Sequence, residues 1–427
     1  MRGRWWPWLL LVLALLPALL IPKRRPLVRV VPSATLTEAI FANPRTLDPA
    51  LADSAAEWAI DSNLFQPLFG ETSSGGAIRE LVSRAQWHGH TLRLWIKPVP
   101  LVGGGHLTAV VVAGALARPL WPMVASPTAR QLLAPVQGSQ AVIQGKTPFL
   151  PGVATVGKRE VVIHFTTRVT RTLLKQLANP ALSIVPASDM LRGGANWQLT
   201  NLFGTGGYRL TNWVPQGELT FARTGRRGPR EVDITIYPSF QQALLSFANG
   251  AVDVVPVDPL QLPVVSSRLL KEIKAFPIPG TLSLYYHRGS GGVFRYRDVS
   301  VATWVRTSFR GRIRGLGGQW PARWPVGGHM TIAVNRQLPE AVALAQTLAH
   351  LKPHQVTVKE VSLSQLTTLA RTGAINAYIG QANLFSGPWG AIPLVPLRSL
   401  WLVSGNVKGA AVYANGSFDW HRATIVP

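Results

Sequence analysis

Histidines are the side chains best suited to metal chemistry in this 427-residue chain, because it contains no cysteine. His88 and His90 would share one face of a strand and could then ligate a metal ion. No third histidine or acid is close in sequence, and a turn beside Trp87 is the simpler account of the pair. His350 and His354 are four residues apart, but a proline lies between them and opposes a helical metal pair. We therefore predict no metal site and no cofactor.

The motifs of common catalytic sites are missing as well. The chain has no Gly-x-Ser-x-Gly elbow, no His-Glu-x-x-His helix and no carboxylate pair at useful spacing. Gly145-Lys146-Thr147 resembles the end of a phosphate-binding loop, but Gln140 stands where that loop needs its first glycine. The lack of cysteine also excludes disulfides and thiol catalysis. We predict that the protein is not an enzyme.

Basic residues greatly outnumber acidic ones, 43 against 19, for a formal net charge of +24. Such an excess is typical of nucleic-acid binding. Here the charge is spread along the chain, with denser patches at Arg223–Arg230 and Arg295–Arg314. Scarcity of carboxylates also fits a protein that faces an acidic medium or an anionic wall. We favour the second interpretation and do not expect nucleic acid as a partner.

The N-terminus carries a continuous apolar run, Trp5–Ile21, which would span about 26 Å as a helix. It predicts a signal peptide or an uncleaved membrane anchor, followed by a basic linker up to residue 34. No small-x-small cleavage site is evident near its end. We expect an extracytoplasmic protein that is either membrane-associated through this segment or secreted after cleavage. Without cysteine it is not a Cys-linked lipoprotein.

The stretch 203–253 orders the middle of the chain. Its glycines 204, 206 and 207 allow a tight turn without a Cβ penalty. Alternating residues then predict strands, and apolar residues at helical spacing predict one helix before Asn249-Gly250. The predicted elements are the strands 208–213, 218–223, 232–236 and 251–257 and the helix 240–247.

This order resembles the signature region of the extracellular solute-binding proteins of family 5, the oligopeptide, dipeptide and nickel receptors of ABC importers. In that family a Gly-Thr-Gly-Pro-Tyr turn precedes a strand that ends near tryptophan, as Gly204–Tyr208 precedes Trp213 here. A basic loop, a strand and a helix follow, and then a Gly-x-Val-Asp strand, for which Gly250–Asp253 stands. One departure is Gly207, where the family usually has proline.

Other segments follow the family order. Asn43–Gly70 contains a Thr-Leu-Asp-Pro run before a predicted helix, for which Asp53 or Ser54 is the expected cap. We interpret Asp48 and Asp53 as local capping residues and not as catalytic groups. His287 holds a position where the family has asparagine, and Arg306 could be the arginine of the next helix. Further predicted strands are 35–41, 81–97 as a pair, 160–165, 280–287, 330–334, 355–361, 373–380 and 392–397, and further helices are 109–118, 169–177, 267–274, 339–351 and 364–372.

The resemblance implies an α/β protein with the two-lobe periplasmic-binding-protein-like fold of type II, with a ligand cleft between the lobes. We predict these boundaries: 1–34, signal or anchor with linker; 35–278, lobe I with a subdomain at about 60–155; 279–397, a shortened lobe II; 398–427, the return to lobe I. The function implied is to bind a peptide or similar small solute by hinge closure and to deliver it to ABC permease subunits in the membrane. A monomer is expected.

Aromatic and amide side chains are the candidates for ligand contact. They are Tyr285, Tyr286, Asn383, Trp389 and Trp401. For the four aromatic residues, packing in the core is the alternative role. Peptide receptors of this family commonly pair an acid of the second lobe with the ligand's amino group, and the loop 383–389 has none. The alternative function is that of a degenerate family member, anchored at the surface, which binds a polyanion or the cell wall without transport.

Overall fold

The computed structural model describes most of the chain after the N-terminal segment. The described residues are 35–72, 75–102, 104–188, 191, 197–200, 204–287, 293–295, 323–325, 330–336, 338–351, 356–372, 374–375, 377–381 and 389–426. The predicted signal or anchor at 1–34, Arg306 and the candidate Asn383 lie outside them. Within the described ranges no helix is long and apolar enough to cross a membrane. The described residues between 35 and 426 belong to one compact unit.

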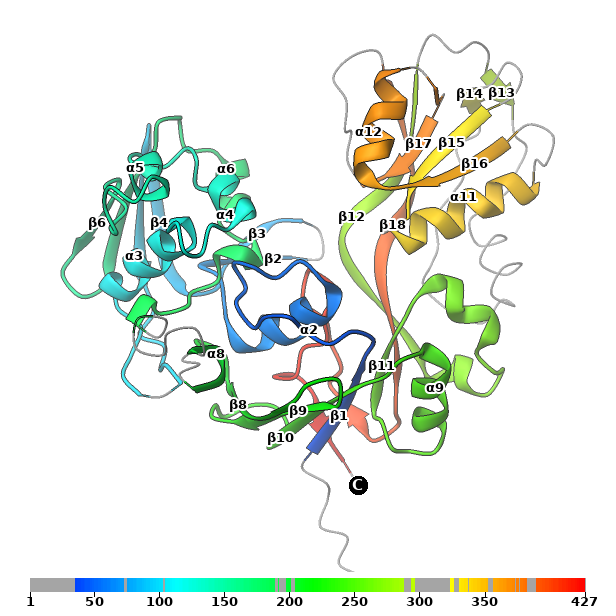
Figure 1. Ribbon diagram of the computed structural model, residues 1–427, viewed down its shortest axis with the longest axis horizontal. Helices are drawn as coiled ribbons and strands as arrows, with labels where there is room; N and C mark the ends of the chain where they lie inside the picture. Colours follow the sequence, from blue (N-terminus) through cyan, green and yellow to red (C-terminus); the bar gives the residue numbers. More distant parts are fainter. Residues whose placement is uncertain are drawn as a thin grey trace, which may run out of the picture. The chain divides into compact units, whose positions relative to one another are not determined.

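A ten-stranded mixed sheet runs through the described part of the chain in the order β16-β15-β17-β12-β18-β11-β1-β10-β9-β8 (Figure 1). Its strands are β1 (Thr35–Ile40), β8 (Tyr208–Val214), β9 (Glu218–Arg223), β10 (Glu231–Ile236), β11 (Val254–Val257), β12 (Ile273–His287), β15 (Met330–Asn335), β16 (Val356–Val361), β17 (Ala377–Gly380) and β18 (Trp389–Val403). The predicted mixed α/β class is confirmed.

The predicted β8–β9 hairpin and third strand form one edge of this sheet. β8, β9 and β10 pair antiparallel, and β1 pairs parallel to β10 with Thr35 opposite Glu231. Helix α9 (Phe240–Ala248) follows. Ser239 caps its first turn, and Asn249 ends it just before Gly250, whose φ is +76°. The hydrophobic alternation and the turn residues therefore predicted this region correctly.

The other edge of the sheet is a parallel arrangement. β15 lies between β16 and β17 and is parallel to both. Helices α11 (Pro339–Leu351) and α12 (Leu363–Arg371) connect these strands. Ser362 caps α12 with a reciprocal capping box, a contact that satisfies two backbone N–H groups. This edge has the strand–helix–strand pattern that the sequence predicted.

Two fifteen-residue strands, β12 and β18, join the two edges. They pair antiparallel with each other from Ile273 opposite Leu402 to His287 opposite Trp389. β18 also pairs with β11 on one side, and β12 pairs with β17 on the other. The predicted helix at 267–274 is wrong: residues 269–272 form only a 3₁₀ turn, η5, and β12 has begun by Ile273. The long β18 partner outweighs the local helical pattern there.

A separate four-stranded antiparallel sheet has the order β4-β5-β7-β6. It consists of β4 (Val82–His88), β5 (Thr91–Ile96), β6 (Val153–Val156) and β7 (Glu160–His164). Helices α3 (Ala109–Ala117), α4 (Pro127–Leu132), α5 (Ser139–Ile143) and α6 (Arg171–Gln176) accompany it. Its apolar cluster draws on residues between Leu68 and Ile184. The strand and helix predictions for this region are confirmed to within two residues at most ends.

The remaining elements are short. They are α2 (Ala55–Leu64), β2 (Phe69–Glu71), β3 (Ala77–Arg79), η1 (Arg118–Leu120), η2 (Pro180–Leu182), α8 (Trp197–Thr200), η4 (Pro259–Val264), η5 (Leu269–Glu272), β13 (Val293–Arg295), β14 (Arg323–Pro325), β19 (Val407–Lys408) and β20 (Thr424–Ile425). A second large apolar cluster among the described residues extends from α9 and β11 through β12 and β18 to α11. The two linking strands are therefore part of a shared core.

Candidate functional site

The strand pair β12–β18 is interrupted at its middle. The register shifts between Pro277 and Thr281, and Gly280 has a φ of +114°. Prolines at 277 and 279 cannot donate a ladder hydrogen bond, and β18 carries further prolines at 393 and 396. A Cβ at Gly280 would lie 2.8 Å from Leu397 Cδ1, so the Leu397 side chain packs against the glycine. Fewer ladder hydrogen bonds can therefore hold the two strands together at this position.

Three of the predicted ligand residues lie at one end of this pair. Tyr285 and Tyr286 end β12, and Trp389 begins β18 opposite His287. Tyr285 is buried and stacks on Tyr378 of β17 with ring centroids 4.8 Å apart, so it packs beneath α12. Tyr286 points to the opposite face of the strand. It is half-buried against the apolar cluster that runs from α9 through β12 and β18 to α11.

Trp401 lies near the other end of β18, twelve residues from Trp389. Its side chain is 3% exposed, and its indole N–H donates to Ser399 Oγ at 2.8 Å. The ring packs against Phe418, with centroids 5.3 Å apart. The contacts of Trp401, like those of Tyr285, are those of a core residue, which was the alternative role that the sequence left open.

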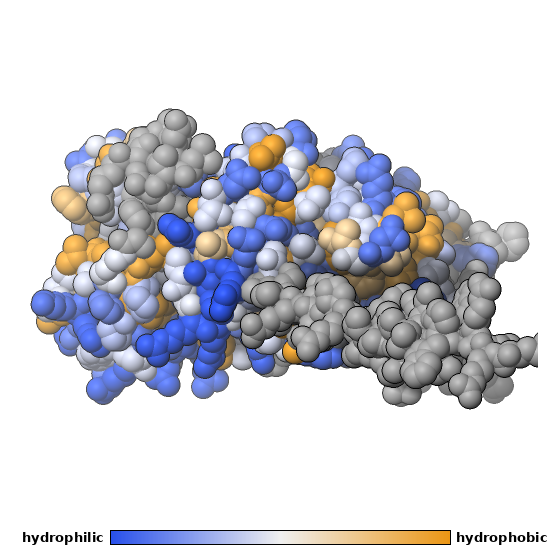
Figure 2. Space-filling model, turned by 90° about the horizontal axis from the view of Figure 1, so that it is seen from below, coloured by the Kyte–Doolittle hydropathy of each residue, from blue (hydrophilic) through white to orange (hydrophobic). Residues whose placement is uncertain are grey.

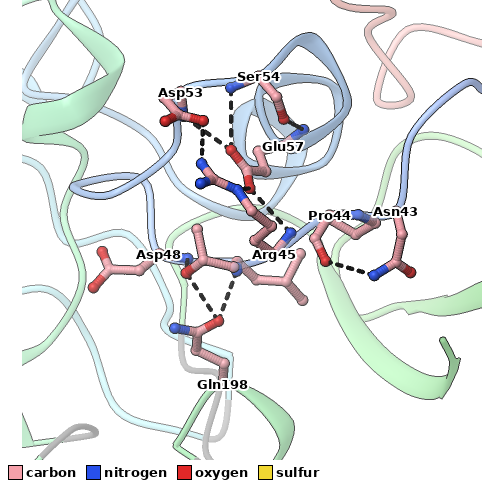
Figure 3. Close-up of polar contacts among 10 residues, drawn as sticks. Asn43, Pro44, Arg45, Asp48, Asp53, Ser54, Glu57 and Gln198 are labelled. Atoms are coloured by element: carbon pink, nitrogen blue, oxygen red, sulfur yellow. Dashed lines mark hydrogen bonds and ion pairs between the residues drawn. The ribbon is translucent and has the colours of Figure 1, made fainter.

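The Thr-Leu-Asp-Pro segment is fixed by side chains from distant parts of the chain (Figure 3). Gln198 Oε1 accepts hydrogen bonds from Thr46 Oγ1 at 3.1 Å and from the Leu47 N–H at 2.7 Å. Asp48 accepts the Ala50 N–H at 3.0 Å, as local capping predicted. The segment is therefore held from α8 as well as by its own turn.

A buried ion pair adds to this attachment. Both guanidinium nitrogens Nη1 and Nη2 of Arg118 donate to the Asp48 carboxylate, at 2.6 and 2.8 Å, and both side chains are 2% exposed or less. The Arg118 guanidinium also lies over the Trp197 ring, 5.7 Å from its centroid. The two parallel hydrogen bonds fix how Arg118 and Asp48 face each other. Loss of either partner would leave the other charge buried without compensation. Nothing in the sequence pointed to Arg118.

Helix α2 begins with a dense set of polar contacts, also drawn in Figure 3. Ser54, one of the two residues predicted as the cap, is the N-cap and accepts the Glu57 N–H at 3.2 Å. The buried Glu57 carboxylate accepts the backbone N–H groups of Arg45, Asp53 and Ser54 at 2.9 to 3.1 Å. The Arg45 guanidinium contacts both Glu57 and Asp53. Asp53 is thus an exposed partner of Arg45 and not the helix cap.

The glycine turn packs against the end of α2. The Gly206 N–H donates to Leu64 O at 2.9 Å, and a Cβ at Gly204 or Gly206 would overlap carbonyl oxygens of that helix. A Cβ at Gly207 would lie 2.8 Å from His421 Cε1. Any larger residue at 207, proline included, would displace His421, and this contact accounts for the departure from the family motif.

Two acids are buried nearby without full compensation. Glu38 is fully buried and accepts the Trp420 indole N–H at 2.6 Å through Oε2, while its Oε1 has no partner. Burial raises the pKa of Glu38 to about 8. Neither carboxylate oxygen of Asp61 has a partner, and burial, followed by the charges of Asp48 and Glu57, raises its pKa well above 3.8. Burial therefore favours the protonated form of both carboxyl groups.

No metal centre emerges among the described residues, where no three His, Cys, Asp or Glu side chains gather. His90 Nδ1 lies 3.3 Å from the Phe165 carbonyl oxygen. The four-stranded region has an apolar pocket of about 450 Å³, lined by α3 residues such as Val111 and by Leu150 and Pro186. No residue that the sequence singled out lines this pocket.

This architecture is the two-lobe, type II periplasmic-binding-protein-like class. Residues 106–299 match the model of the bacterial extracellular solute-binding proteins, family 5 Middle. The resemblance to family 5 that the sequence motifs carry is therefore confirmed over these residues. A search of the curated proteins found no match.

Solved structures of low sequence identity share the fold. The periplasmic murein tripeptide binding protein MppA, in an unliganded open form, is 16% identical with a TM-score of 0.67, over 92% of this chain and 98% of that one. An ABC transporter substrate-binding protein from Sinorhizobium meliloti is 14% identical, TM-score 0.66, over 92% and 100%. Haemophilus influenzae OppA, in complex with the peptide RPPGFSPFR, is 15% identical, TM-score 0.60, over 92% and 99%.

Proposed function

We propose that this protein is an extracytoplasmic receptor that binds a peptide or similar small solute between its lobes and delivers it to an ABC permease. The family-model match over residues 106–299 on a two-lobe fold is the observation that carries this proposal. The interrupted strand pair β12–β18 supports a hinge at residues 277–281. Hinge closure would shift the population toward the ligand-bound state.

We infer the ligand class from the names of the similar structures and from the aromatic candidates Tyr286 and Trp389. MppA is named for a murein tripeptide, and OppA is seen with a nonapeptide. Half-buried Tyr286, together with Trp389 and Asn383, is our proposed contact set. The loop 383–389 contains no acid. We therefore propose a ligand that is held by its backbone and not by a free amino group.

The proposed boundaries are lobe I at 35–278, lobe II at 279–397 and the return at 398–427. The proposed partners are the solute and the permease subunits, and the receptor acts as a monomer without cofactor, nucleic acid or catalysis. We propose that residues 5–21 either anchor the chain in the membrane or direct its secretion.

Native mass spectrometry of the gently purified full chain tests this proposal. A discrete co-purifying mass, released on partial unfolding, is expected, together with thermal stabilisation by matching peptides. Tyr286→Ala should weaken binding about tenfold or more, because an aromatic contact to a ligand is commonly worth over 1 kcal/mol. Tyr237→Ala, another half-buried tyrosine of the same apolar cluster outside the strand pair, is the control. A clean apo mass and no stabilisation by any peptide pool would refute a receptor role.

The second candidate is a family member without transport that binds a polyanion or the cell wall. The net charge of +24 favours it. Such binding would fall steeply with salt, since it releases counterions. Affinity for a soluble anionic polymer that is lost at high salt, with no small solute bound, would select this function instead.

A further inference from the structure

The loop between β9 and β10 is the densest cationic feature in the described part of the chain. The segment TGRRGPR, residues 224–230, carries Arg226, Arg227 and Arg230, all exposed. Arg223 precedes it at the end of β9. The ion pairs found among the described residues leave these arginines without a carboxylate partner. Figure 2 shows the molecule from below, where strongly hydrophilic side chains gather.

This cationic loop (residues 223–230) is held in a fixed shape. The N–H groups of Thr224 and Gly225 both donate to Gly207 O, at 2.7 and 3.0 Å. Arg223 donates to the Gly228 carbonyl, and Tyr208 Oη donates to Pro229 O at 3.0 Å. The loop therefore uses Arg223 for its own structure and presents the other three arginines from a fixed backbone.

The loop lies where the chain enters the sheet. Glu231, next to Arg230, is opposite Thr35 in the β1–β10 pair, and the two side chains are 3.4 Å apart at Oε1 and Oγ1. Thr35 is the first described residue. The preceding 13 residues, 22–34, contain four basic residues and follow the apolar run Trp5–Ile21. Fully extended, that linker reaches at most about 45 Å.

We propose that the cationic loop binds the anionic phospholipid headgroups of the membrane that holds residues 5–21. Guanidinium groups match phosphate oxygens with two parallel hydrogen bonds. A short basic linker keeps the loop close to that surface, so both contacts form together. The surface sets which face of lobe I is turned to the bilayer. This inference rests on the proposed membrane attachment and is independent of the solute.

Each arginine near an anionic bilayer contributes about fivefold to its partitioning, so loss of three should lower occupancy of this orientation about a hundredfold. The test variant is Arg226→Gln/Arg227→Gln/Arg230→Gln, which leaves Arg223 and its contact intact. The matched control removes three charges from the four-stranded region, as Lys146→Gln/Lys158→Gln/Arg159→Gln.

The absence of cysteine allows a single probe to be placed at will. Thr224→Cys puts a fluorophore in the loop, and Val214→Cys puts one at the exposed far end of the β8–β9 hairpin, about 20 Å away. Full chain in vesicles with a lipid-bound acceptor is compared on neutral phosphatidylcholine and on vesicles with 30% phosphatidylglycerol. We expect energy transfer from the Thr224 site to rise on anionic vesicles and to fall again in 0.5 M salt. Of the two triple variants, only the arginine variant should lose this rise.

Equal transfer on both lipids, or a loss shared by the lysine control, would overturn the proposal. A soluble anionic polymer that removes the Thr224 signal as effectively as salt, while the chain stays on neutral vesicles, would assign the loop to a polyanion instead. Retention on vesicles after an alkaline wash reports attachment separately. A chain that is retained only on anionic vesicles, and is released by salt, would still support binding by the cationic loop. A chain that is retained on neither type of vesicle would overturn the proposal.

Discussion

Glu38 is the side chain for which the structure makes the sharpest prediction. It lies in the middle of β1, opposite both Ile234 and Val254, with no exposed surface. The Trp420 indole N–H reaches only one of its oxygens. We propose to test Glu38→Gln, since a glutamine keeps an oxygen for that N–H and carries no charge at any pH.

The direction in which stability changes with pH depends on whether the folded or the unfolded chain binds the proton of Glu38 more tightly. The pKa of Glu38 is raised from 4.5 to about 8 by burial, so between these values the folded chain binds more protons than the unfolded chain. Its stability therefore falls as pH rises through that window and stops falling above it. The full difference corresponds to about 5 kcal/mol. Relative to the glutamine variant, the natural chain should lose about 4 kcal/mol between pH 5 and pH 9.

Thermal unfolding at a series of pH values measures this difference. For a unit of this size that unfolds cooperatively, about 4 kcal/mol corresponds to about 5 °C in Tm. We expect Glu38→Gln to match the natural chain near pH 5 and to exceed it by that amount at pH 9. Glu218→Gln, an exposed glutamate on β9, is the control and should change nothing. A Glu38→Gln variant with the pH dependence of the natural chain would refute the reasoning.

The other predictions concern the buried polar contacts and the glycine turn. Arg118→Leu should lower the free energy of unfolding in urea by about 3–5 kcal/mol, because it leaves the buried Asp48 carboxylate without its cation. The double variant Arg118→Leu/Asp48→Leu should recover much of that loss. An equal loss in the single and double variants would argue against a compensated pair. Gly204→Ala should prevent stable folding, since its Cβ overlaps a carbonyl of α2, whereas Gly250→Ala, with open space and a φ of +76°, should cost about 1 kcal/mol by thermal unfolding. Asp61→Asn should stabilise the protein at neutral pH and lose that advantage toward acid pH, and an unchanged melting curve at pH 8 would contradict the raised pKa of Asp61.

Elements whose ends are marked by local chemistry could be predicted from the sequence. Ser54 caps α2 and Asn249-Gly250 ends α9 because caps and left-handed glycines act within one turn. The two linking strands were predicted at about half their length. Prolines at 277 and 393 interrupt the hydrophobic pattern, and only the pairing of β12 with β18 makes the full strands visible. Pairing of that kind depends on a partner about 120 residues away.

The roles of the site residues could not be predicted for the same reason, because they depend on partners distant in the sequence. Arg118 has an ordinary helical neighbourhood, and its role depends on Asp48, seventy residues earlier. Trp401 was grouped with Trp389 because aromatic residues line ligand sites, but twelve residues of extended strand separate them by about 40 Å. Residue type therefore identified candidates, while the strand register decided which of them lie together.

The buried acids bear on why this chain is so basic. Burial raises the pKa of Glu38, Asp61, Glu340 and Asp419, so each contributes stability that is lost as pH rises. His421 opposes them, because burial lowers its pKa and the folded chain resists its protonation. A partner such as nucleic acid would explain the net charge alone and would leave these interior groups unexplained. An acidic medium agrees with both observations. A chain with few surface carboxylates gains little further charge there, and the raised pKa values of these acids make the fold more stable toward acid pH. These acids therefore shift stability toward acid pH, the direction that fits the acidic medium expected from the sequence.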